Sequence, residues 1–313
     1  MATRPIAITS APRATAENQQ GTRPVSRYAA VADYWALTKP EINFLIAVAT
    51  FTGFYLGQAT HSQRFPFVRL IHTLLGTLLV ASGTGTLNQY IERSFDAQMR
   101  RTARRPLVAG KLTPRAVLSF GIALSWVGSA YLAITVNALA SLLAIVTLAS
   151  YLFLFTPLKR KTALSILVGA FPGAMPPLIG WAAAAGKLSL GAWILYAIIF
   201  LWQFPHFMAI AWMYREDYDR AGYIVLPLGR ARGRFVTLQT MLPLLALLPL
   251  SLLAISADHR SIFHYAVFIL SLGFFFCAAQ FVLRKSRTTA RNLLMASIFY
   301  LPLLFLTLVV SKV

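Results

Sequence analysis

The chain has 313 residues, of which 58% are hydrophobic and only 12% are charged, and its formal net charge is +20 at pH 7. This composition excludes an ordinary soluble globular protein. The positive charge is divided among short segments between long apolar runs, and no nucleic-acid-binding motif accompanies it, so nucleic acid is excluded as a partner.

The N-terminal segment is polar and contains proline, threonine and arginine without apolar periodicity. Such a segment cannot bury enough apolar surface to fold, so residues 1–33 are predicted to be a disordered cytoplasmic tail. The tail has no acidic residue before Glu17, which leaves an organelle transit peptide as an alternative. Residues 34–313 are predicted to form one transmembrane domain.

Nine apolar runs follow the tail, and they are long enough to span a bilayer as helices. Because lipid offers no partners for backbone N–H and C=O groups, runs of this kind are helical. The sequence therefore predicts an all-α integral membrane protein with about nine transmembrane helices. The expected spans are Ile42–Gly57, Leu70–Ile91, Val117–Val136, Ala138–Phe155, Leu164–Ala184, Ala192–Tyr214, Phe235–Ile255, Ile262–Leu283 and Leu293–Val310.

Basic residues predict the orientation of these spans. Most of the 29 lysines and arginines fall in the N-terminal segment and after the second, fourth, sixth and eighth spans. The positive-inside rule therefore predicts a cytoplasmic N-terminus and a C-terminus on the other side. We expect a bacterial inner membrane with a periplasmic C-terminus; the mitochondrial inner membrane is the alternative. The opposite side receives only Arg64, Arg69, Lys187, Arg260 and Lys312.

The chain shows a weak internal symmetry. Acidic residues and then a basic loop follow both the second and the sixth span, and the loops after the fourth and eighth spans read LKRKT and LRKSR. The offset is four helices each time. We therefore expect two pseudo-repeated four-helix halves plus a ninth helix, an arrangement that commonly places a site between the halves.

Three polar side chains mark the end of the second span. Asn88, Glu92 and Asp96 are spaced i, i+4, i+8 and so share one helix face. Like charges at this spacing repel, and a divalent cation would reverse that cost. Mg²⁺ prefers oxygen ligands and is typically held by one or two carboxylates together with substrate phosphates. The alternative is a solvated helix end, although acids beside a membrane span are costly and are functional candidates by default.

Basic residues surround this predicted metal site. The nine positions after Asp96 contain four arginines, Arg100, Arg101, Arg104 and Arg105, in the sequence MRRTARRPL. Guanidinium groups bind phosphate oxygens in a forked geometry, so acids followed by arginines suit a metal-bridged diphosphate. On the same predicted side, Lys159 and Arg160 in TPLKRKT are further candidates to bind the phosphates; they are equally well explained as positive-inside anchors.

A second acidic cluster follows the sixth span, in YREDYDRAG. It contains Glu216, Asp217 and Asp219, and it lies on the same predicted side as the first cluster. Two facing carboxylate clusters with a diphosphate between them would form a metal-dependent site that ionises the diphosphate. The sequence leaves open which acid of this cluster reaches the metal.

These motifs resemble those of the intramembrane (UbiA-type) prenyltransferases, and more closely those of the branch that farnesylates protohaem IX. The spacing N-x₃-E-x₃-D followed by MRRTARRPL resembles the first signature of the superfamily. Glu92 stands where the superfamily usually has Asp, and the second D-x₃-D pattern falls on Tyr214 and Tyr218. The other matching segments are LTKP at Leu37–Pro40, TPLKRKT at Thr156–Thr162, GAMPPLIGW at Gly173–Trp181, LWQFPHF at Leu201–Phe207 and DYDRAGYIVLP at Asp217–Pro227.

The resemblance implies transfer of farnesyl from farnesyl diphosphate to a vinyl group of haem B, which gives haem O. It also implies a Mg²⁺ cofactor and contact with haem A synthase or oxidase assembly factors. By position, it makes Asn88, Glu92, Asp96 and Asp217 the catalytic residues, with Glu216 as a further metal ligand. The residues implied to bind the diphosphate are Arg101, Arg104, Arg105, Lys159 and Arg160.

The sixth span carries the candidates for contact with haem. Gln203, His206 and Asp217 are expected on one stripe of the helix, and Trp202 flanks His206. His206 would then contact haem as an iron ligand or a hydrogen-bond donor. The alternative is a histidine whose partner lies on a neighbouring helix.

Two other functions stay open. A sibling prenyltransferase acting on an aromatic quinone precursor would share the diphosphate site but would not need porphyrin. A membrane transporter also carries polar residues and repeats within its spans, but its sites lie near the middle of the membrane. The acids here cluster near one membrane face.

Overall fold

The computed structural model describes residues 27–58, 64–227, 229, 231–253 and 261–312, and within them each of the nine apolar runs is mostly helical. The first half contains α1 (Arg27–Leu37), α2 (Pro40–Gly57), α3 (Phe67–Asp96), α4 (Pro114–Thr135), α5 (Ala138–Ala149), the π-helix η1 (Ser150–Phe155) and α6 (Thr156–Leu158). The second half contains α7 (Ser165–Gly173), α8 (Pro176–Ala185), α9 (Leu190–Met213), α10 (Arg215–Arg220), α11 (Ala231–Leu253), α12 (Ser261–Arg284) and α13 (Arg287–Lys312).

Eight segments of the described chain are long and apolar enough to cross a membrane. They include the continuous segments Ala138–Leu158, made of α5, η1 and α6, and Ser165–Ala185, made of α7 and α8. The predicted multi-pass, all-helical membrane protein is thereby confirmed. The expected first span forms α2, which is not among the eight and whose first turn contains the polar residues Glu41 and Asn43. The count of nine spans stays a prediction.

The predicted boundary between tail and membrane domain falls inside a helix. Residues 27–33, expected to be disordered, belong to α1, which begins at Arg27. Their sequence RYAAVAD contains enough alanine and apolar residues to continue the helix toward Leu37. The rest of the predicted tail, residues 1–26, lies outside the described residues.

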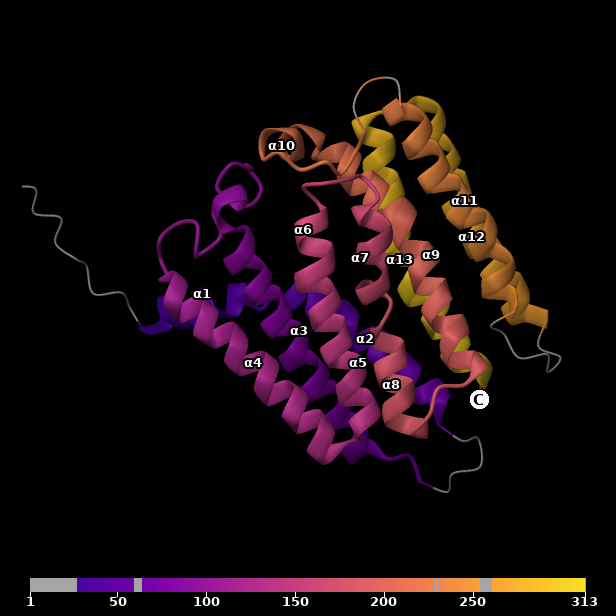
Figure 1. Ribbon diagram of the computed structural model, residues 1–313. Helices are drawn as coiled ribbons and strands as arrows, with labels where there is room; N and C mark the ends of the chain where they lie inside the picture. The colour runs from indigo at the N-terminus through magenta and orange to yellow at the C-terminus, as the bar shows by residue number, and fades with distance from the viewer. Residues whose placement is uncertain (1–26, 59–63, 228, 230, 254–260, 313) are drawn as a thin grey trace, which may run out of the picture.

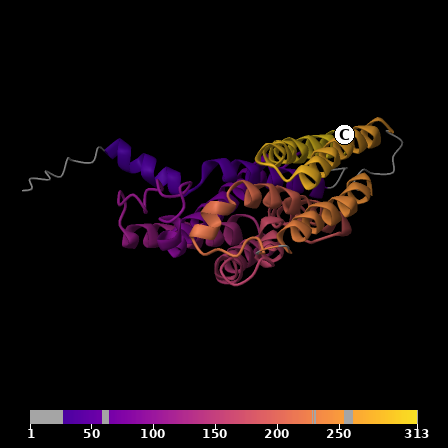
Figure 2. The same ribbon diagram turned by 90° about the horizontal axis from the view of Figure 1, so that it is seen from above.

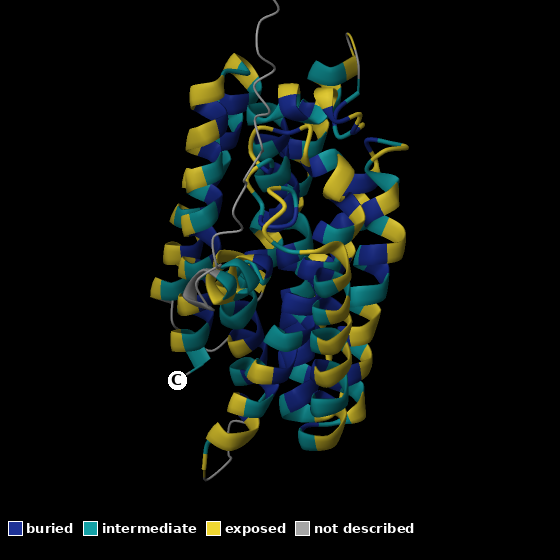
Figure 3. Cartoon of the chain, turned by 90° about the vertical axis from the view of Figure 1, so that its left-hand side faces the viewer, coloured by how far each residue is buried: buried dark blue, intermediate teal, exposed yellow. Residues whose placement is uncertain are grey.

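The helices run roughly along one direction, and the two halves of the chain lie side by side (Figures 1 and 2). α3 packs along α4, α2 packs on α8, and α9 contacts both α11 and α13. Exposed residues occupy the outer flanks of the helices, and buried residues lie between them (Figure 3). Large apolar side chains such as Trp126, Phe153 and Leu283 are exposed on these flanks, as expected where the neighbour is lipid.

Backbone contact between α2 and α8 depends on two glycines. A Cβ atom added at Gly53 would lie 2.1 Å from the carbonyl oxygen of Pro177, and one added at Gly180 would lie 2.0 Å from the carbonyl oxygen of Thr50. Small residues let the backbones of two membrane helices come into van der Waals contact. The two helices can therefore pack this closely because Gly53 and Gly180 have no side chain.

The last helix, α13, also contacts the end of α2. Lys312, in α13, donates through Nζ to the carbonyl oxygens of Tyr55 (2.8 Å), Leu56 (3.1 Å) and Gln58 (2.6 Å). These carbonyls belong to the end of α2, where helix carbonyls lack partners within the helix. A cation at this position also interacts favourably with the helix dipole.

One end of the bundle gathers the polar connections. The loop after α3, the turn between α6 and α7, and α10 all lie toward the upper end in Figure 1. The three segments come from distant parts of the sequence. They carry the second acidic cluster and the predicted diphosphate-binding residues, and the loop after α3 begins directly after Asp96.

Candidate active site

The last turns of α3 present a buried polar column. Asn88, Glu92 and Asp96 lie on this helix and are 2%, 6% and 1% exposed. Their spacing of four residues places them on one face, as the sequence predicted, and that face is turned into the protein. A solvated helix end would leave these side chains exposed, so their burial argues against that alternative.

Both carboxylates of the column form ion pairs. Glu92 Oε1 lies 2.8 Å from Lys159 Nζ, and Asp96 Oδ2 pairs with the guanidinium of Arg105. A buried carboxylate without such a partner would be strongly destabilising. Two predicted diphosphate-binding residues therefore lie within contact of the two predicted acids.

Asn88 is fixed by a partner at each end of its amide. Asn88 Nδ2 donates to Thr156 Oγ1 (3.3 Å), and Lys39 Nζ donates to Asn88 Oδ1 (3.3 Å). Thr156 can accept because its own hydroxyl donates to the carbonyl oxygen of Tyr151 (2.8 Å). This bond reaches back five residues, across η1, and π-helical turns of this kind are frequent at functional sites.

Sequence reasoning did not assign a role to Lys39 or Thr156. Both lie in segments that carried the family resemblance, LTKP and TPLKRKT, and this was the available signal. Burial is the largest influence on Lys39 and, with the nearby Arg105 and Lys159, lowers its pKa to about 7, although Glu92 and Asp96 act in the opposite direction.

Lys159 is surrounded by aromatic rings. Its Nζ lies 4.5 Å from the centre of the Phe155 ring and 6.0 Å from the ring centres of both Tyr151 and Tyr223. Burial alone would lower the pKa of Lys159, but the carboxylate of Glu92 outweighs burial and raises that pKa above its ordinary value. Burial, followed by Glu92, likewise raises the pKa of Tyr223. Lys159 therefore keeps its positive charge in this aromatic surrounding.

The loop after α3 sends its arginines in different directions. Arg105 points to Asp96, whereas Arg101 and Arg104 are exposed. The guanidinium of Arg101 lies 5.3 Å from the centre of the Tyr214 ring. The loop returns to α3 through Thr102, whose hydroxyl donates to the carbonyl oxygen of Asp96 (2.8 Å).

Arg160, the remaining basic candidate, is exposed and lies over Phe95. Its guanidinium carbon is 4.3 Å from the centre of that ring. This contact holds Arg160 beside α3, next to the residue that precedes Asp96. The exposed arginines, here called the basic rim, are Arg101, Arg104 and Arg160, whereas Arg105 and Lys159 are partly buried and pair with the column.

In the second acidic cluster, one member is buried. Asp217, in α10, is 9% exposed; its Oδ2 accepts a bond from the main-chain N–H of Arg101 (3.4 Å) and its Oδ1 pairs with Arg220 (3.2 Å). Glu216 and Asp219 are exposed. The structure therefore joins the two clusters through Asp217 and the loop after α3, and it does not bring Glu216 into this contact.

The three haem-contact candidates have partners inside the bundle. His206 Nδ1 lies 2.8 Å from Ser297 Oγ, and Trp202 Nε1 donates to the carbonyl oxygen of Ser297 (2.9 Å). Gln203 Nε2 instead donates to the carbonyl oxygen of Ala170 (3.2 Å). The expected single stripe on α9 thus divides, with Trp202 and His206 facing α13 and Gln203 facing α7.

The donor set suits Mg²⁺. No group of three or more His, Cys, Asp or Glu side chains that could hold a metal ion exists in the described part of the chain. The column of Asn88, Glu92 and Asp96 offers an amide and two carboxylates, all oxygen donors. A Mg²⁺ ion that also binds phosphates and water needs only one or two carboxylates from the protein, so these residues fit the ion.

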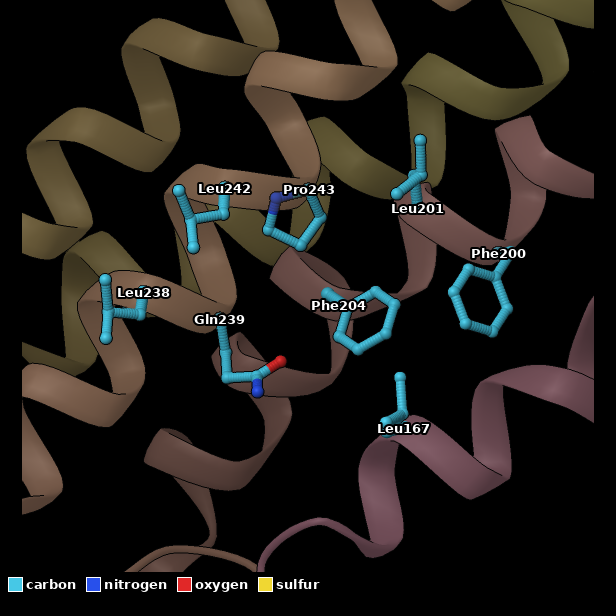
Figure 4. Close-up of a pocket in the computed structure, with 8 residues that line it drawn as sticks. All are labelled: Leu167, Phe200, Leu201, Phe204, Leu238, Gln239, Leu242 and Pro243. Atoms are coloured by element: carbon cyan, nitrogen blue, oxygen red, sulfur yellow. The ribbon is translucent and has the colours of Figure 1, made fainter.

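An apolar hollow of about 460 Å³ lies elsewhere, between α7, α9 and α11 (Figure 4). None of the predicted site residues lines it, and its polar side chain is Gln239. It is therefore separate from the buried polar column. The other lining residues are Leu167, Phe200, Leu201, Phe204, Leu238, Leu242 and Pro243.

Solved structures share this architecture. A UbiA homolog from Aeropyrum pernix K1 superposes with a TM-score of 0.63 and 20% identity, over 85% of this chain and 98% of the other. A UbiA homolog from Archaeoglobus fulgidus bound to DMAPP and Mg²⁺ superposes with a TM-score of 0.59 and 14% identity, over 88% of this chain and 99% of the other. These likenesses show a common fold.

Sequence comparison is more specific. A Solibacter usitatus protein named protoheme IX farnesyltransferase is 45% identical over 280 residues, which cover 87% of this chain and 96% of that protein. The model of the UbiA prenyltransferase family matches residues 46–306. Because this match includes the buried column, both ion pairs and α10, the chain belongs to the UbiA prenyltransferase family.

Proposed function

We propose that the protein transfers a farnesyl group from farnesyl diphosphate to a vinyl group of haem B, forming haem O. The observation that carries the proposal is the 45% identity, over nearly the whole of both chains, to a protein named protoheme IX farnesyltransferase. The buried column and its basic neighbours supply a site with the chemistry that a diphosphate substrate needs.

The acidic side of this site is formed by Asn88, Glu92 and Asp96. Their oxygens would hold Mg²⁺, which, when bound, stabilises the negative charge of a leaving diphosphate as a Lewis acid. Asp217 positions the arginine loop against the column through the main-chain N–H of Arg101. The A. fulgidus homolog bound to DMAPP and Mg²⁺ supports a metal-dependent reaction in this fold.

The basic side is formed by Arg105 and Lys159 together with the basic rim of Arg101, Arg104 and Arg160. These side chains bind the diphosphate oxygens and hold its reactive C–O bond toward the membrane interior. That bond breaks with its electron pair on the diphosphate. The vinyl carbon of haem B bonds to the farnesyl carbon, and water adds to the resulting cation with loss of a proton.

The acceptor and the location are the remaining parts of the proposal. His206, Gln203 and Trp202 are the proposed haem contacts on α9, with His206 held by Ser297 at 2.8 Å. We place the protein in a bacterial inner membrane, with its N-terminus cytoplasmic and its C-terminus periplasmic. Haem A synthase or oxidase assembly factors are the proposed protein partners, because they would receive the product.

The test is a reaction with the purified full-length protein in detergent. Haem B, farnesyl diphosphate and Mg²⁺ are supplied, and mass spectrometry is used to seek a haem heavier by one farnesyl group and one water. We expect this product with wild type, and we expect none with EDTA or with the Asp96→Ala variant. An Asp219→Ala variant, which alters an exposed acid of the second cluster, is the matched control and should remain active.

Each other outcome contradicts a defined part of the proposal. Farnesyl transfer to an aromatic acid but not to haem would overturn the acceptor and keep the diphosphate site. Full activity of a folded Asp96→Ala variant would overturn the metal assignment. No transfer to either acceptor by folded protein would overturn the proposed enzyme activity and favour a transporter.

A further inference from the structure

Lys39 lies at the corner between α1 and α2, in the LTKP segment, and its backbone is held in place from several directions. Gln89 Nε2 donates to the carbonyl oxygen of Leu37 (2.8 Å), and Asn43 Nδ2 donates to the carbonyl oxygen of Thr38 (3.0 Å). Lys39 itself adopts a left-handed conformation, with φ of 55°, which is uncommon for a residue other than glycine. These contacts fix the corner against α3.

The side chain of Lys39 follows a clear path to the polar column. A Cβ atom added at Gly85 of α3 would lie 3.5 Å from Lys39 Cδ and 3.9 Å from Lys39 Cε. The lysine stem therefore runs along α3 beside Gly85. At the end of this path, Lys39 Nζ reaches Asn88 Oδ1 at 3.3 Å.

The charges around the column do not balance. Glu92 is paired with Lys159 and Asp96 with Arg105, so each carboxylate already has a cation. The hydrogen-bond partner of Lys39 is the neutral amide of Asn88. Buried charges are normally compensated by an opposite charge. With Lys39 protonated, the described site holds three cations and two carboxylates, an excess of positive charge that suits an anion.

We propose that Lys39 binds the diphosphate directly, as a third partly buried cation beside Arg105 and Lys159. This inference rests on the proposed function, because it assigns a further residue to the same diphosphate site. An ammonium group forms short, charge-assisted hydrogen bonds to phosphate oxygens. Binding of the diphosphate then supplies the counter-charge that Asn88 does not.

The test measures binding instead of turnover. Inorganic pyrophosphate is titrated by calorimetry into the full-length protein in detergent, at saturating Mn²⁺ as the metal. Lys39→Asn removes the cation and suits the left-handed backbone, because asparagine adopts that conformation more readily than most residues. We expect about ten- to hundredfold weaker pyrophosphate binding for this variant.

Two variants complete the design. Lys39→Arg keeps a cation and should restore most of the affinity. Lys111→Met removes a lysine that pairs with Asp33 on α1 (3.1 Å), and it should bind pyrophosphate like wild type. Thermal unfolding of each variant confirms that it is folded.

A further comparison separates direct contact from an effect through Asn88. In an Asn88→Ala background, Lys39→Asn should still weaken binding by a similar factor. If the second substitution then has no effect, Lys39 acts only by orienting Asn88 and the proposal is overturned. Unchanged binding by Lys39→Asn alone overturns it as well. Failure of wild type to bind pyrophosphate would instead overturn the diphosphate site itself.

Discussion

Asp217 Oδ2 accepts a hydrogen bond from the main-chain N–H of Arg101, which lies 116 positions earlier in the chain. The contact joins α10 to the loop that follows the buried column of α3. Arg220 supports it from the other side, because it pairs with Asp217 Oδ1 and also donates to the carbonyl oxygen of Gln98 (3.4 Å). Asp217 thus positions the arginine loop, whatever further contact it makes with a metal.

This geometry predicts that Asp217 matters more for activity than the other acids of the second cluster. We expect Asp217→Asn to lower kcat/KM for farnesyl diphosphate by at least about tenfold, because a buried carboxylate that accepts two bonds is lost. Glu216→Gln should stay within about twofold of wild type, because Glu216 is exposed. Steady-state kinetics of the two variants decide the ranking, and a larger loss from Glu216→Gln would reverse the assignment.

Arg101 should affect one substrate only. Its guanidinium lies over Tyr214 at the rim of the site, 5.3 Å from the ring centre. We expect Arg101→Ala to raise the KM for farnesyl diphosphate about tenfold or more while haem binding, followed by absorbance titration, is unchanged. Arg100→Ala, in the same exposed loop, is the control. Equal loss of both substrates from Arg101→Ala would point to a disturbed loop.

Thr156 is a positioning residue for Asn88. Thr156→Val keeps the side-chain shape but removes the hydroxyl that accepts from Asn88 Nδ2. The Asn88 amide then loses the contact that sets its orientation, so we expect the Mg²⁺ concentration for half-maximal activity to rise several-fold. Thr156→Ser retains the hydroxyl and should restore the wild-type value. An unchanged Mg²⁺ dependence in Thr156→Val would contradict this role.

The contact between α2 and α8 predicts a stability effect. Gly180→Ala places a methyl group against the backbone of Thr50, and overpacking of this kind costs about 1–3 kcal/mol. We expect a lower unfolding temperature in detergent for Gly180→Ala. Gly273→Ala in α12 is the control, because nothing lies within 4 Å of a Cβ added there. Equal unfolding temperatures for the two variants would show that the helices shift apart without cost.

The column of Asn88, Glu92 and Asp96 could be predicted because its geometry is local. A helical spacing of four residues places three side chains on one face whatever surrounds them. The helices themselves were equally predictable, because long apolar runs in lipid have few other conformations. The sequence did not show which way the column faces, since that depends on how α3 packs against its neighbours.

The contacts that the sequence did not predict join residues far apart in the chain. Lys39 and Thr156 reach Asn88 from 49 and 68 positions away, and no local spacing encodes such distances. The expected stripe on α9 divided for a related reason: α9 has α7 on one side and α13 on another, so neighbouring residues of one stripe, Gln203 and His206, meet different helices.

Lys312 has a consequence for biogenesis. The end of α2 receives its capping ammonium group from α13, which the ribosome makes more than 250 residues later. Until then, three carbonyl groups at the end of α2 lack this donor. The end of α2 therefore gains this partner only after α13 has been made. The contact between α2 and α13 through Lys312 therefore forms late in the assembly of these helices.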